Sequence, residues 1–513
     1  MVKNGVGRSI LEYIERIGKL KVYESAFSIV PMGNKAGPKL KRPLPHKSKL
    51  INSLEEAIRA TGLRDGMTIS FHHHFRNGDY IVNMVVDVIA KMGIKDLKLA
   101  PSSLGTCHGP LIQHIKNGVI TRIESSGLRD PLGAAISEGI MENPVIIRSH
   151  GGRARAIESG ELKIDVAFLG APACDEYGNA NGFSGKSACG SLGYGIVDAK
   201  YADQVVMITD NLVDYPCLPA SINQTQVDYV VVVDSIGDPK GIVSGAIRHT
   251  KNPRDILIAE NAVKAIVASG YFKDGFSYQT GAAGASLAVT EFLRKEMIER
   301  NVKGGFGLGG ITSQLVQLYE EGLFKGLFDT QSFDLVAAES IGKNPEHFEI
   351  DASFYANPHN SGPAVNNLDL VMLGALEIDT KFNVNVMTGS DGVISQAVGG
   401  HPDTAAGAKM SVILAPLIRG RLPIVVDDVT TVVTPGETVD VVVTDRGIAV
   451  NPLREDLIAN FKKAGLSLYT IEELKEMAEK ITGKPEPIEF GEKIVGVVQY
   501  RDGTIIDVIR QVK

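Results

Sequence analysis

The sequence predicts an α/β protein made of two homologous, mostly parallel α/β domains in tandem. Between residues 51 and 450, short apolar runs alternate with helical patterns, which is typical of a parallel sheet covered by helices. An internal repeat is the second observation. The run 164–171 (IDVAFLGA) is echoed by 368–375 (LDLVMLGA), and Asp175, Asn179 and Asn181 recur at the same offset as Asp379, Asn383 and Asn385. A constant offset over several blocks indicates duplication of one domain.

Residues 1–50 precede the repeat. The spacing of Ile10, Leu11, Ile14 and Ile17 predicts a helix over residues 5–20. Residues 35–49 combine lysines with prolines, so we expect an extended basic arm, either a solubilising tail or a docking segment for an acidic partner.

The first domain is expected over residues 51–250 and the second over 251–450. A β-branched run at 229–233 reads as the last strand of the first copy, which places the boundary between 234 and 261. Residues 451–513 form a C-terminal extension with helical patterns at 453–464 and 471–481. A hairpin is predicted around Asp502-Gly503, and we expect the extension to cap the second domain or to contact another subunit.

Composition excludes several classes of protein. The chain has 513 residues, 44% hydrophobic and 22% charged, as in ordinary globular proteins, and no apolar run is long enough to span a membrane. No signal-peptide pattern is visible, so a cytoplasmic location is expected. The net charge of −7 argues against nucleic-acid binding. Cys107, Cys174, Cys189 and Cys217 lack paired spacing, which predicts reduced thiols and no metal cluster.

The glycine-rich stretch 303–322 is the densest in candidate chemistry. Gly305, Gly307, Gly309 and Gly310 precede a helical pattern, and such a loop could hold phosphate, carboxylate or an oxyanion on backbone N–H groups. A dinucleotide fingerprint and a plain strand-to-helix turn are alternatives. In the repeat alignment Gly307–Gly310 falls opposite Ser103–Thr106, so we expect equivalent strand ends in both halves.

Histidines dominate the polar residues of the first copy. His72, His73 and His74 end its first strand, where adjacent side chains point to opposite faces, so at most His72 and His74 could share a metal ion. No cysteine or carboxylate lies nearby at ligand spacing. We therefore interpret these histidines as structural or as substrate-binding groups. Arg76 suits a carboxylate clamp, or else a surface ion pair.

The second copy offers matching positions. Gln279 and the loop 280–284, with Gly281 and Gly284 leaving room for a ligand, occupy the place of the histidine run. Gly399 and Gly400, with His401 and Asp403, are expected in the same site, a simple turn being the alternative. Glu339 is a weak candidate nucleophile. Neither a nucleophile-elbow motif nor a Walker loop is present.

Several of these runs carry a family resemblance. They are FHHHFRNGD (71–79), IDVAFLGAPACDEYGNANG (164–182), GGFGLGG (304–310), LDLVMLGALEID (368–379) and VGGHPD (398–403). Through them the chain resembles, over essentially its whole length, the citrate lyase alpha subunits, a branch of the CoA-transferase superfamily. The resemblance implies two tandem CoA-transferase-like α/β domains.

The resemblance also implies an activity. Citrate would replace acetate on the thioester of an acyl carrier protein, or of CoA, giving a citryl thioester and acetate. The carrier's thiol belongs to a phosphoribosyl-dephospho-CoA prosthetic group, so no cofactor is expected on this chain itself. The implied partners are the carrier (gamma) and citryl lyase (beta) subunits, within a complex that holds several copies of the chain.

The implied mechanism is direct transfer. The glutamate nucleophile of many superfamily members falls near Gly309 here, so the citrate carboxylate itself would attack and form a mixed anhydride. The amides of Gly309, Gly310, Gly399 and Gly400 are the expected oxyanion donors. Substrate would be bound by His72, His73, His74, Arg76, Gln279, Gly281, Gly284, His401 and Asp403.

Other functions remain open at this point. An acetate- or succinate-type CoA-transferase would use Glu339 covalently, and a malonate decarboxylase alpha subunit would share the direct mechanism. From other classes, an NAD-binding oxidoreductase and a non-catalytic scaffold of a larger complex are alternatives.

Overall fold

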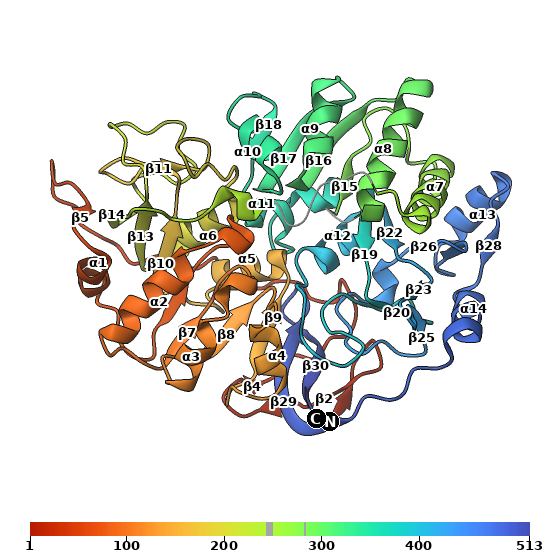
Figure 1. The fold of residues 1–513 in the computed structure, drawn as a ribbon, viewed down its shortest axis with the longest axis horizontal. Coiled ribbons are helices and arrows are strands. Elements are labelled where there is room, and N and C mark those ends of the chain that lie inside the picture. The colour runs from red at the N-terminus through yellow and green to blue at the C-terminus, as the bar shows by residue number, and fades with distance from the viewer. Residues whose placement is uncertain (243–249, 282–283) are drawn as a thin grey trace.

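The computed structural model describes residues 1–242, 250–281 and 284–513, which form two α/β halves side by side (Figure 1). The first half is built on a ten-stranded sheet in the order β30-β29-β9-β8-β7-β6-β10-β13-β14-β5. The second half is built on a nine-stranded sheet in the order β18-β17-β16-β15-β19-β22-β26-β27-β28. Two large, mostly parallel sheets confirm the predicted fold class.

The first sheet is parallel from β29 to β5, and only the terminal strand β30 runs antiparallel. Its strands are β5 (Leu50–Ile51), β6 (Thr68–Ser70), β7 (Leu97–Leu99), β8 (Ile120–Ser125), β9 (Val145–Arg148), β10 (Val166–Gly170), β13 (Gln204–Thr209), β14 (Tyr229–Val232), β29 (Phe490–Gln499) and β30 (Ile505–Val512). Its helices are α1 (Leu54–Thr61), α2 (Ile81–Lys91), α3 (Leu111–Lys116), α4 (Leu132–Ser137), α5 (His150–Glu158) and α6 (Gly193–Tyr201).

The second sheet repeats this plan. Its strands are β15 (Tyr278–Thr280), β16 (Gly304–Ile311), β17 (Phe324–Ser332), β18 (His347–Glu349), β19 (Leu370–Gly374), β22 (Met410–Leu414), β26 (Val441–Val443), β27 (Ile448–Val450) and β28 (Leu468–Tyr469). Its helices are α7 (Pro253–Ala268), α8 (Gly284–Glu299), α9 (Ser313–Glu320), α10 (Leu335–Ser340), α11 (Ala352–Ala356), α12 (His401–Gly407), α13 (Glu455–Lys463) and α14 (Ile471–Thr482).

Hydrogen bonds at equivalent positions confirm the internal repeat. Asp165 accepts from the Thr68 amide at 2.8 Å, and Asp369 accepts from the Ser277 amide at 2.9 Å, so each carboxylate ties a central strand to its neighbour. Asp175 and Asp379 each accept from the side-chain amide of the asparagine four residues later. The blocks that the sequence showed to be similar therefore perform the same structural task.

The predicted alignment of the glycine stretch is wrong by four residues. Ile69 pairs with Leu99 in the first sheet and Tyr278 pairs with Gly307 in the second, which makes Leu99, not Ser103, the counterpart of Gly307. The offset between copies is not constant because the connections between equivalent strands differ in length.

The predicted N-terminal helix is also wrong. Residues 2–19 form two small hairpins, β1 (Val2–Lys3) with β2 (Ser9–Ile10) and β3 (Tyr13–Ile14) with β4 (Gly18–Lys19). The Asn4 side chain accepts from the Arg8 amide at 2.8 Å and closes the first turn. Isoleucines four residues apart resemble a helical stripe, but here successive hairpins bring Ile10 and Ile14 onto the same cluster as Val497.

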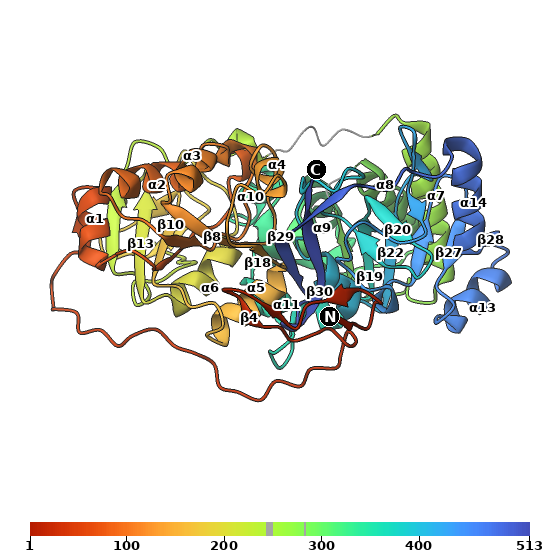
Figure 2. The same ribbon diagram turned by 90° about the horizontal axis from the view of Figure 1, so that it is seen from below.

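The basic arm follows the hairpins along the outside of the molecule to β5 (Figure 2). Lys35 pairs with Glu158 at 3.1 Å and Lys39 with Asp203 at 2.8 Å, and Lys41 pairs with Asp228. Each of these three ammonium groups is paired with a carboxylate of the same chain. The arm therefore has three fewer free charges for docking an acidic partner.

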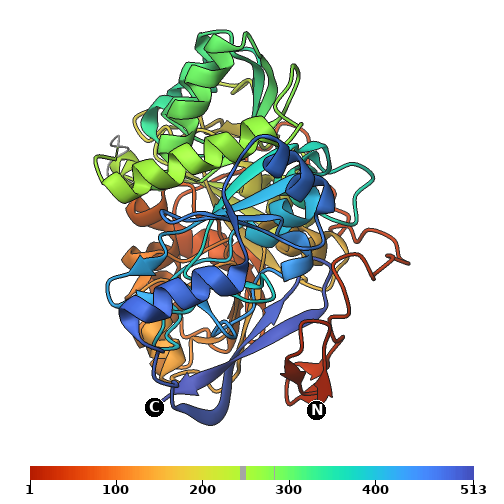
Figure 3. The same ribbon diagram turned by 90° about the vertical axis from the view of Figure 1, so that its right-hand side faces the viewer.

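The C-terminal extension divides between the halves. Helices α13 and α14 pack on the second half, against α7 and the short strand β25 (Val425–Val426) respectively. The predicted hairpin is confirmed as β29–β30, but β29 pairs with β9 and so extends the first sheet instead of capping the second domain. Figure 3 shows the hairpin below the C-terminal helices.

Candidate active site between the two halves

The junction between the halves collects loops from the carboxyl ends of strands in both sheets. Helices α5 and α6 of the first half contact α11 of the second, and α6 also contacts β17 (Figure 1). In parallel α/β sheets, ligands bind beyond the carboxyl ends of the strands. The junction is therefore the candidate site.

The three histidines follow β6 and alternate in direction. The rings of His72 and His74 lie 3.9 Å apart and are buried, and His72 Nε2 lies 3.0 Å from the Gly170 amide nitrogen. His73 instead stacks on Tyr194. Burial lowers the pKa of His72 to about 4 and those of His73 and His74 well below the ordinary value. All three imidazoles are therefore neutral at neutral pH and do not act as counter-charges. His72 and His73 form ring hydrogen bonds, whereas neither ring nitrogen of His74 has a partner among the described residues.

An aromatic wall links these histidines to the helices of the first half. Tyr194 lies in the first turn of α6. The centroid of its ring is 4.9 Å from that of His73 and 4.4 Å from that of His150, the first residue of α5. His73 Nδ1 lies 2.5 Å from the Ser102 hydroxyl. Burial, with a contribution from Arg153, lowers the pKa of His150 to about 3, so this ring is neutral as well.

Two arginines provide the positive charge of the site. Arg76 adopts a left-handed backbone conformation (φ +52°), and its buried Nη1 has no hydrogen-bond partner in the part of the chain that the structure describes. Burial and, as a smaller contribution, the nearby charge of Arg129 together lower the pKa of Arg76 to about 10. Neither arginine forms an ion pair with any described carboxylate. Two like charges held together without counter-ions favour an anion with two or more charges.

The second half contributes Gln279, at the centre of β15, whose Nε2 donates to the Tyr355 hydroxyl at 2.8 Å. Glycines make this contact possible. A Cβ on Gly309, which has φ +95°, would lie 2.7 Å from Gln279 Nε2, and one on Gly400 would lie 2.6 Å from the Tyr355 hydroxyl. The carbonyl of Gly399 accepts from the His150 amide at 2.9 Å, which joins this cluster to the first half.

The glycine-rich stretch is strand β16 and not a loop, which corrects its predicted form. It pairs with β17 over residues 304–311, with a bulge between Gly309 and Gly310. A Cβ on Gly310 would lie 2.1 Å from the ring of Phe333, and that ring lies 5.2 Å from the guanidinium carbon of Arg76. Close packing against Gln279 and Phe333 explains why residues 309 and 310 are glycines. A dinucleotide loop between strand and helix is excluded.

His401 is bonded within the second half, whereas Asp403 links the two halves. His401 Nδ1 lies 2.7 Å from the Thr434 hydroxyl and Nε2 lies 2.9 Å from the Gly374 carbonyl, so both ring nitrogens are bonded. Asp403 accepts from the Ser149 hydroxyl and the Gly151 amide, each at 2.9 Å, and so caps α5 of the other half. The structure gives both side chains a structural task, and contact with substrate remains a prediction for them.

The remaining predicted residues lie apart from these contacts. A Cβ on Gly284 would meet Asp255 at 2.9 Å, and one on Gly281 would meet Ser286 at 3.5 Å; Ala282 and Ala283 of the same loop lie outside the described residues. Glu339 is 65% exposed and pairs with Lys343 on the surface of α10. This position does not suit a nucleophile for a buried reaction.

Sequence reasoning missed several members of the cluster, including Ser102, Arg129, Tyr194, Gln331 and Tyr355. Ser102 and Arg129 follow β7 and β8 as the histidines follow β6. Their position just after a predicted strand is a sequence signal that could have identified them. Gln331, just beyond the β17 partner of Gly309, donates to the His73 carbonyl at 3.1 Å. The tyrosines are helical, and no pattern marked them.

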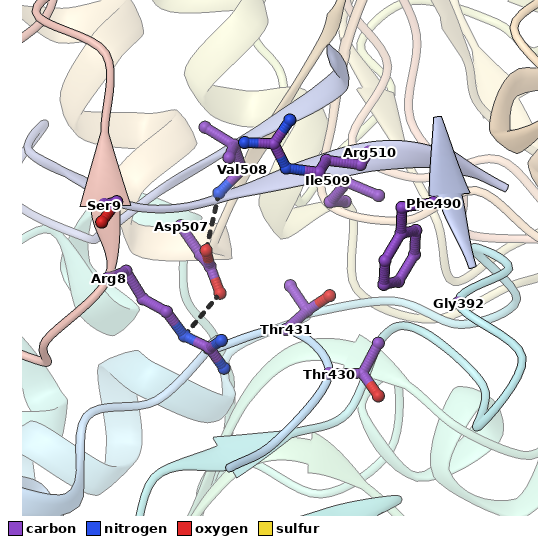
Figure 4. Close-up of a pocket in the computed structure, with 10 residues that line it drawn as sticks. All are labelled: Arg8, Ser9, Gly392, Thr430, Thr431, Phe490, Asp507, Val508, Ile509 and Arg510. Carbon is purple, nitrogen blue, oxygen red and sulfur yellow. Dashed lines mark hydrogen bonds and ion pairs between the residues drawn. The ribbon is translucent and has the colours of Figure 1, made fainter. Parts of the chain in front are cut away.

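Within the described ranges, no group of three or more His, Cys, Asp or Glu side chains could hold a metal ion, and no helix is long and apolar enough to cross a membrane. The four cysteines are free thiols, as predicted. A cavity of about 290 Å³ beside the C-terminal hairpin is a structural joint (Figure 4). There Asp507 pairs with Arg8 at 3.3 Å and accepts from the Val432 and Val508 amides.

Known proteins resemble the whole chain. The family model "Citrate lyase, alpha subunit (CitF)" matches residues 47–512. The citrate lyase alpha chain of Klebsiella pneumoniae is 62% identical over 465 residues, 91% of this chain and 92% of that one. A crystal structure of the putative citrate lyase alpha subunit of Streptococcus mutans in complex with citrate superimposes with a TM-score of 0.97 at 58% identity, covering 99% of this chain and 100% of that one. A Pseudomonas malonate decarboxylase hetero-tetramer in complex with malonate shares the fold at 15% identity, with a TM-score of 0.65 over 86% and 84% of the two chains.

Proposed function

The chain belongs to the citrate lyase alpha-subunit family, and from this premise we propose that it exchanges citrate for acetate on a thioester at the junction between its halves. The substrates are citrate and the acetyl thioester of an acyl carrier protein or of CoA. The products are the citryl thioester and acetate.

The pair of arginines carries the proposal. Citrate is a trianion at neutral pH, and Arg76 and Arg129 are two cations, close enough for the charge of Arg129 to lower the pKa of Arg76, with no carboxylate partner among the described residues. Each guanidinium can form two parallel hydrogen bonds to one carboxylate. A monocarboxylate would neutralise only one of them, which favours a di- or tricarboxylate substrate.

The reaction needs no nucleophile from the protein. A citrate carboxylate attacks the acetyl carbonyl and forms a tetrahedral intermediate. The intermediate collapses by expelling the thiolate, and the remaining product is a mixed anhydride of citrate and acetate. The same thiolate then attacks the citryl carbonyl and expels acetate, so bonds and charges balance without an outside proton. Holding both substrates together at the junction supplies the rate enhancement of an intramolecular reaction.

Backbone amides support both tetrahedral oxyanions. The N–H groups of Gly399 and Gly400 have no hydrogen-bond acceptor in the described part of the chain, and both residues lie against His150 or Tyr355 of the cluster. These two are the favoured donors. Gly309 and Gly310 remain predicted donors, although their packing against Gln279 and Phe333 already accounts for glycine at both positions.

Neutral imidazoles suit this chemistry. A protonated His73 or His150 would compete with the arginines for citrate, whereas a neutral ring can accept from or donate to the hydroxyl and carboxylates of the substrate. The low pKa of His150, about 3, keeps the ring neutral throughout the physiological range.

We further propose the setting of this activity. The carrier subunit delivers the thioester on its phosphoribosyl-dephospho-CoA group, the citryl lyase subunit cleaves the product, and several copies of the chain assemble in one cytoplasmic complex. The two catalytic domains correspond to residues 51–250 and 251–450. The site residues are those named above, without a metal ion.

The test is to incubate the purified chain with acetyl-CoA, or acetylated carrier protein, and radiolabelled citrate, and to measure the citryl thioester. A parallel sample is treated with borohydride before peptide mapping. Citryl thioester without a reduced glutamate supports direct transfer. A modified glutamate would replace it with a covalent CoA-transferase mechanism, and no exchange with either donor would refute the proposed activity.

A further inference from the structure

A cavity of about 420 Å³ on the first half lies apart from the proposed active site. Its floor is one face of the first sheet, where side chains of β7, β8, β9 and β29 point outward. Residues 16–21 of the second N-terminal hairpin form its rim. The volume is within the range of cavities that bind small molecules.

The lining is strongly cationic. Six lining residues are basic and two are acidic; the basic ones are Arg16, Lys19, Lys21, Lys98, Arg122 and Arg148. Glu124 pairs with Lys98 at 2.7 Å and with Arg148, and Glu161 pairs with Arg148 at 3.0 Å. Both carboxylates are therefore already shared among cations at the inner end of the cavity.

Among the outer cations, Arg16 pairs with Glu142 at 2.6 Å, whereas the others remain unneutralised. Lys19 and Lys21 are exposed and form no side-chain hydrogen bond or ion pair with any described residue. Among the described residues, Arg122 donates only to the carbonyls of Gly66 and Asp96, each at 3.0 Å. Burial lowers the pKa of Lys98 to about 8, with the charges of Arg148 and Arg122 adding to the effect. Positive potential is thus concentrated in a concave space.

The other copy of the domain shows that the fold does not require these charges. By strand register, Lys98 and Glu124 are equivalent to Phe306 and Phe328. Those two rings pack against each other with centroids 5.1 Å apart. The same face of the same fold is aromatic in one copy and charged in the other, so the charges serve something other than folding.

We propose that this cavity binds a small polyanion that carries two or more phosphate or carboxylate groups. Arg122 and Lys98 would meet the ligand at the sheet surface, and Lys19 and Lys21 would close over it from the rim. The site is independent of the citrate chemistry at the junction, and its test does not depend on that activity.

Isothermal titration of the full chain with inorganic pyrophosphate is the first measurement, and tricarballylate is the carboxylate probe. Both titrations are repeated on the Arg76→Met chain, in which anion binding at the junction should be weakened, and only binding that persists there is assigned to this cavity. We expect one saturable pyrophosphate site outside the junction, or a tricarballylate site with the same properties, and the probe that binds identifies the ligand class. The Lys19→Glu/Lys21→Glu variant should weaken that binding at least tenfold. Bound probe should also protect Lys19 and Lys21 from acetylation, measured by mass spectrometry.

Lys462→Glu/Lys463→Glu is the matched control, because it reverses two exposed lysines of α13 in the other half. The proposal is overturned if neither probe binds, or if binding survives the rim variant as well as it survives the control. Rim and control variants that weaken binding equally would also overturn it, because only long-range charge would then be involved.

Discussion

Replacing Arg76 by methionine should separate binding from folding, because the two effects have opposite signs. Methionine keeps an unbranched side chain over the ring of Phe333 and removes the charge. In the protein without citrate, Arg76 is a partly buried cation beside a second cation, Arg129, with no described carboxylate to offset either. Such a group destabilises the folded state, and we propose that the chain retains it to bind a ligand.

The pKa of Arg76, lowered to about 10 from 12.5, sets the scale. A base whose folded pKa is lowered destabilises the fold at every pH below that pKa, and each pKa unit corresponds to about 1.4 kcal/mol. After allowance for partial exposure and for the lost contact with Phe333, we expect Arg76→Met to raise the free energy of unfolding by about 1–2 kcal/mol. Loss of charge-assisted hydrogen bonds worth about 1.5–3 kcal/mol should weaken citrate binding about 10- to 150-fold.

Urea unfolding gives the first quantity and isothermal titration with citrate gives the second. Arg421→Met is the control, because Arg421 is exposed and has no described partner; neither measurement should change. Arg129→Met should behave like Arg76→Met. A variant of Arg76 that binds citrate within threefold of the unaltered chain, or that loses stability as well as affinity, would show that the arginine pair is structural.

Three further perturbations test the junction. Burial raises the pKa of Glu349 to about 7, so ionisation of this carboxyl lowers the free energy of unfolding as pH rises from about 4.5 to 7. Urea unfolding at pH 5 and pH 7 measures this loss, and Glu349→Gln should remove about 2 kcal/mol of it. If the variant shows the same difference between the two pH values as the unaltered chain, Glu349 is not the group responsible. Asp403→Asn removes a carboxylate that accepts from two buried donors, so it should lower the free energy of unfolding by about 2–3 kcal/mol in chemical unfolding. An unchanged free energy of unfolding would mean that other contacts hold the halves together. Gly309→Ala should lower the free energy of unfolding by about 1–3 kcal/mol, because φ is +95° and the new methyl group would lie 2.7 Å from Gln279. Adding Gln279→Ala should recover part of that loss. Strictly additive losses in the double variant would show that the two side chains do not clash.

The fold and the family were largely readable from the sequence because both depend on local patterns. Alternating strand and helix runs follow from the periodicity of side chains, and the repeated Asp-x-x-x-Asn pair makes the same turn in each copy. The hairpin around Asp502-Gly503 was visible for the same reason. Periodicity failed for residues 5–20, since a spacing of four also fits two short hairpins packed on Val497.

The candidate site was only half readable. The histidine run and Arg76 stand out as residue types, and Gly399 and Gly400 as a motif. Their protonation and partners were not readable, because a pKa depends on burial and on charges brought near by folding. Arg129, Tyr194 and Tyr355 have ordinary sequence surroundings.

What the sequence determined by itself is therefore the α/β architecture, its duplication and the family, and it singled out the histidine–arginine segment of the candidate site; all of these are properties of short stretches of chain. Only the tertiary structure decided that β29 joins the first sheet, that Asp403 caps α5 across the junction, and that Arg76 lies beside Arg129. Each of these is a contact between distant segments. Such contacts form when apolar strands and helices are buried together, and single-sequence periodicity carries no record of which segments meet.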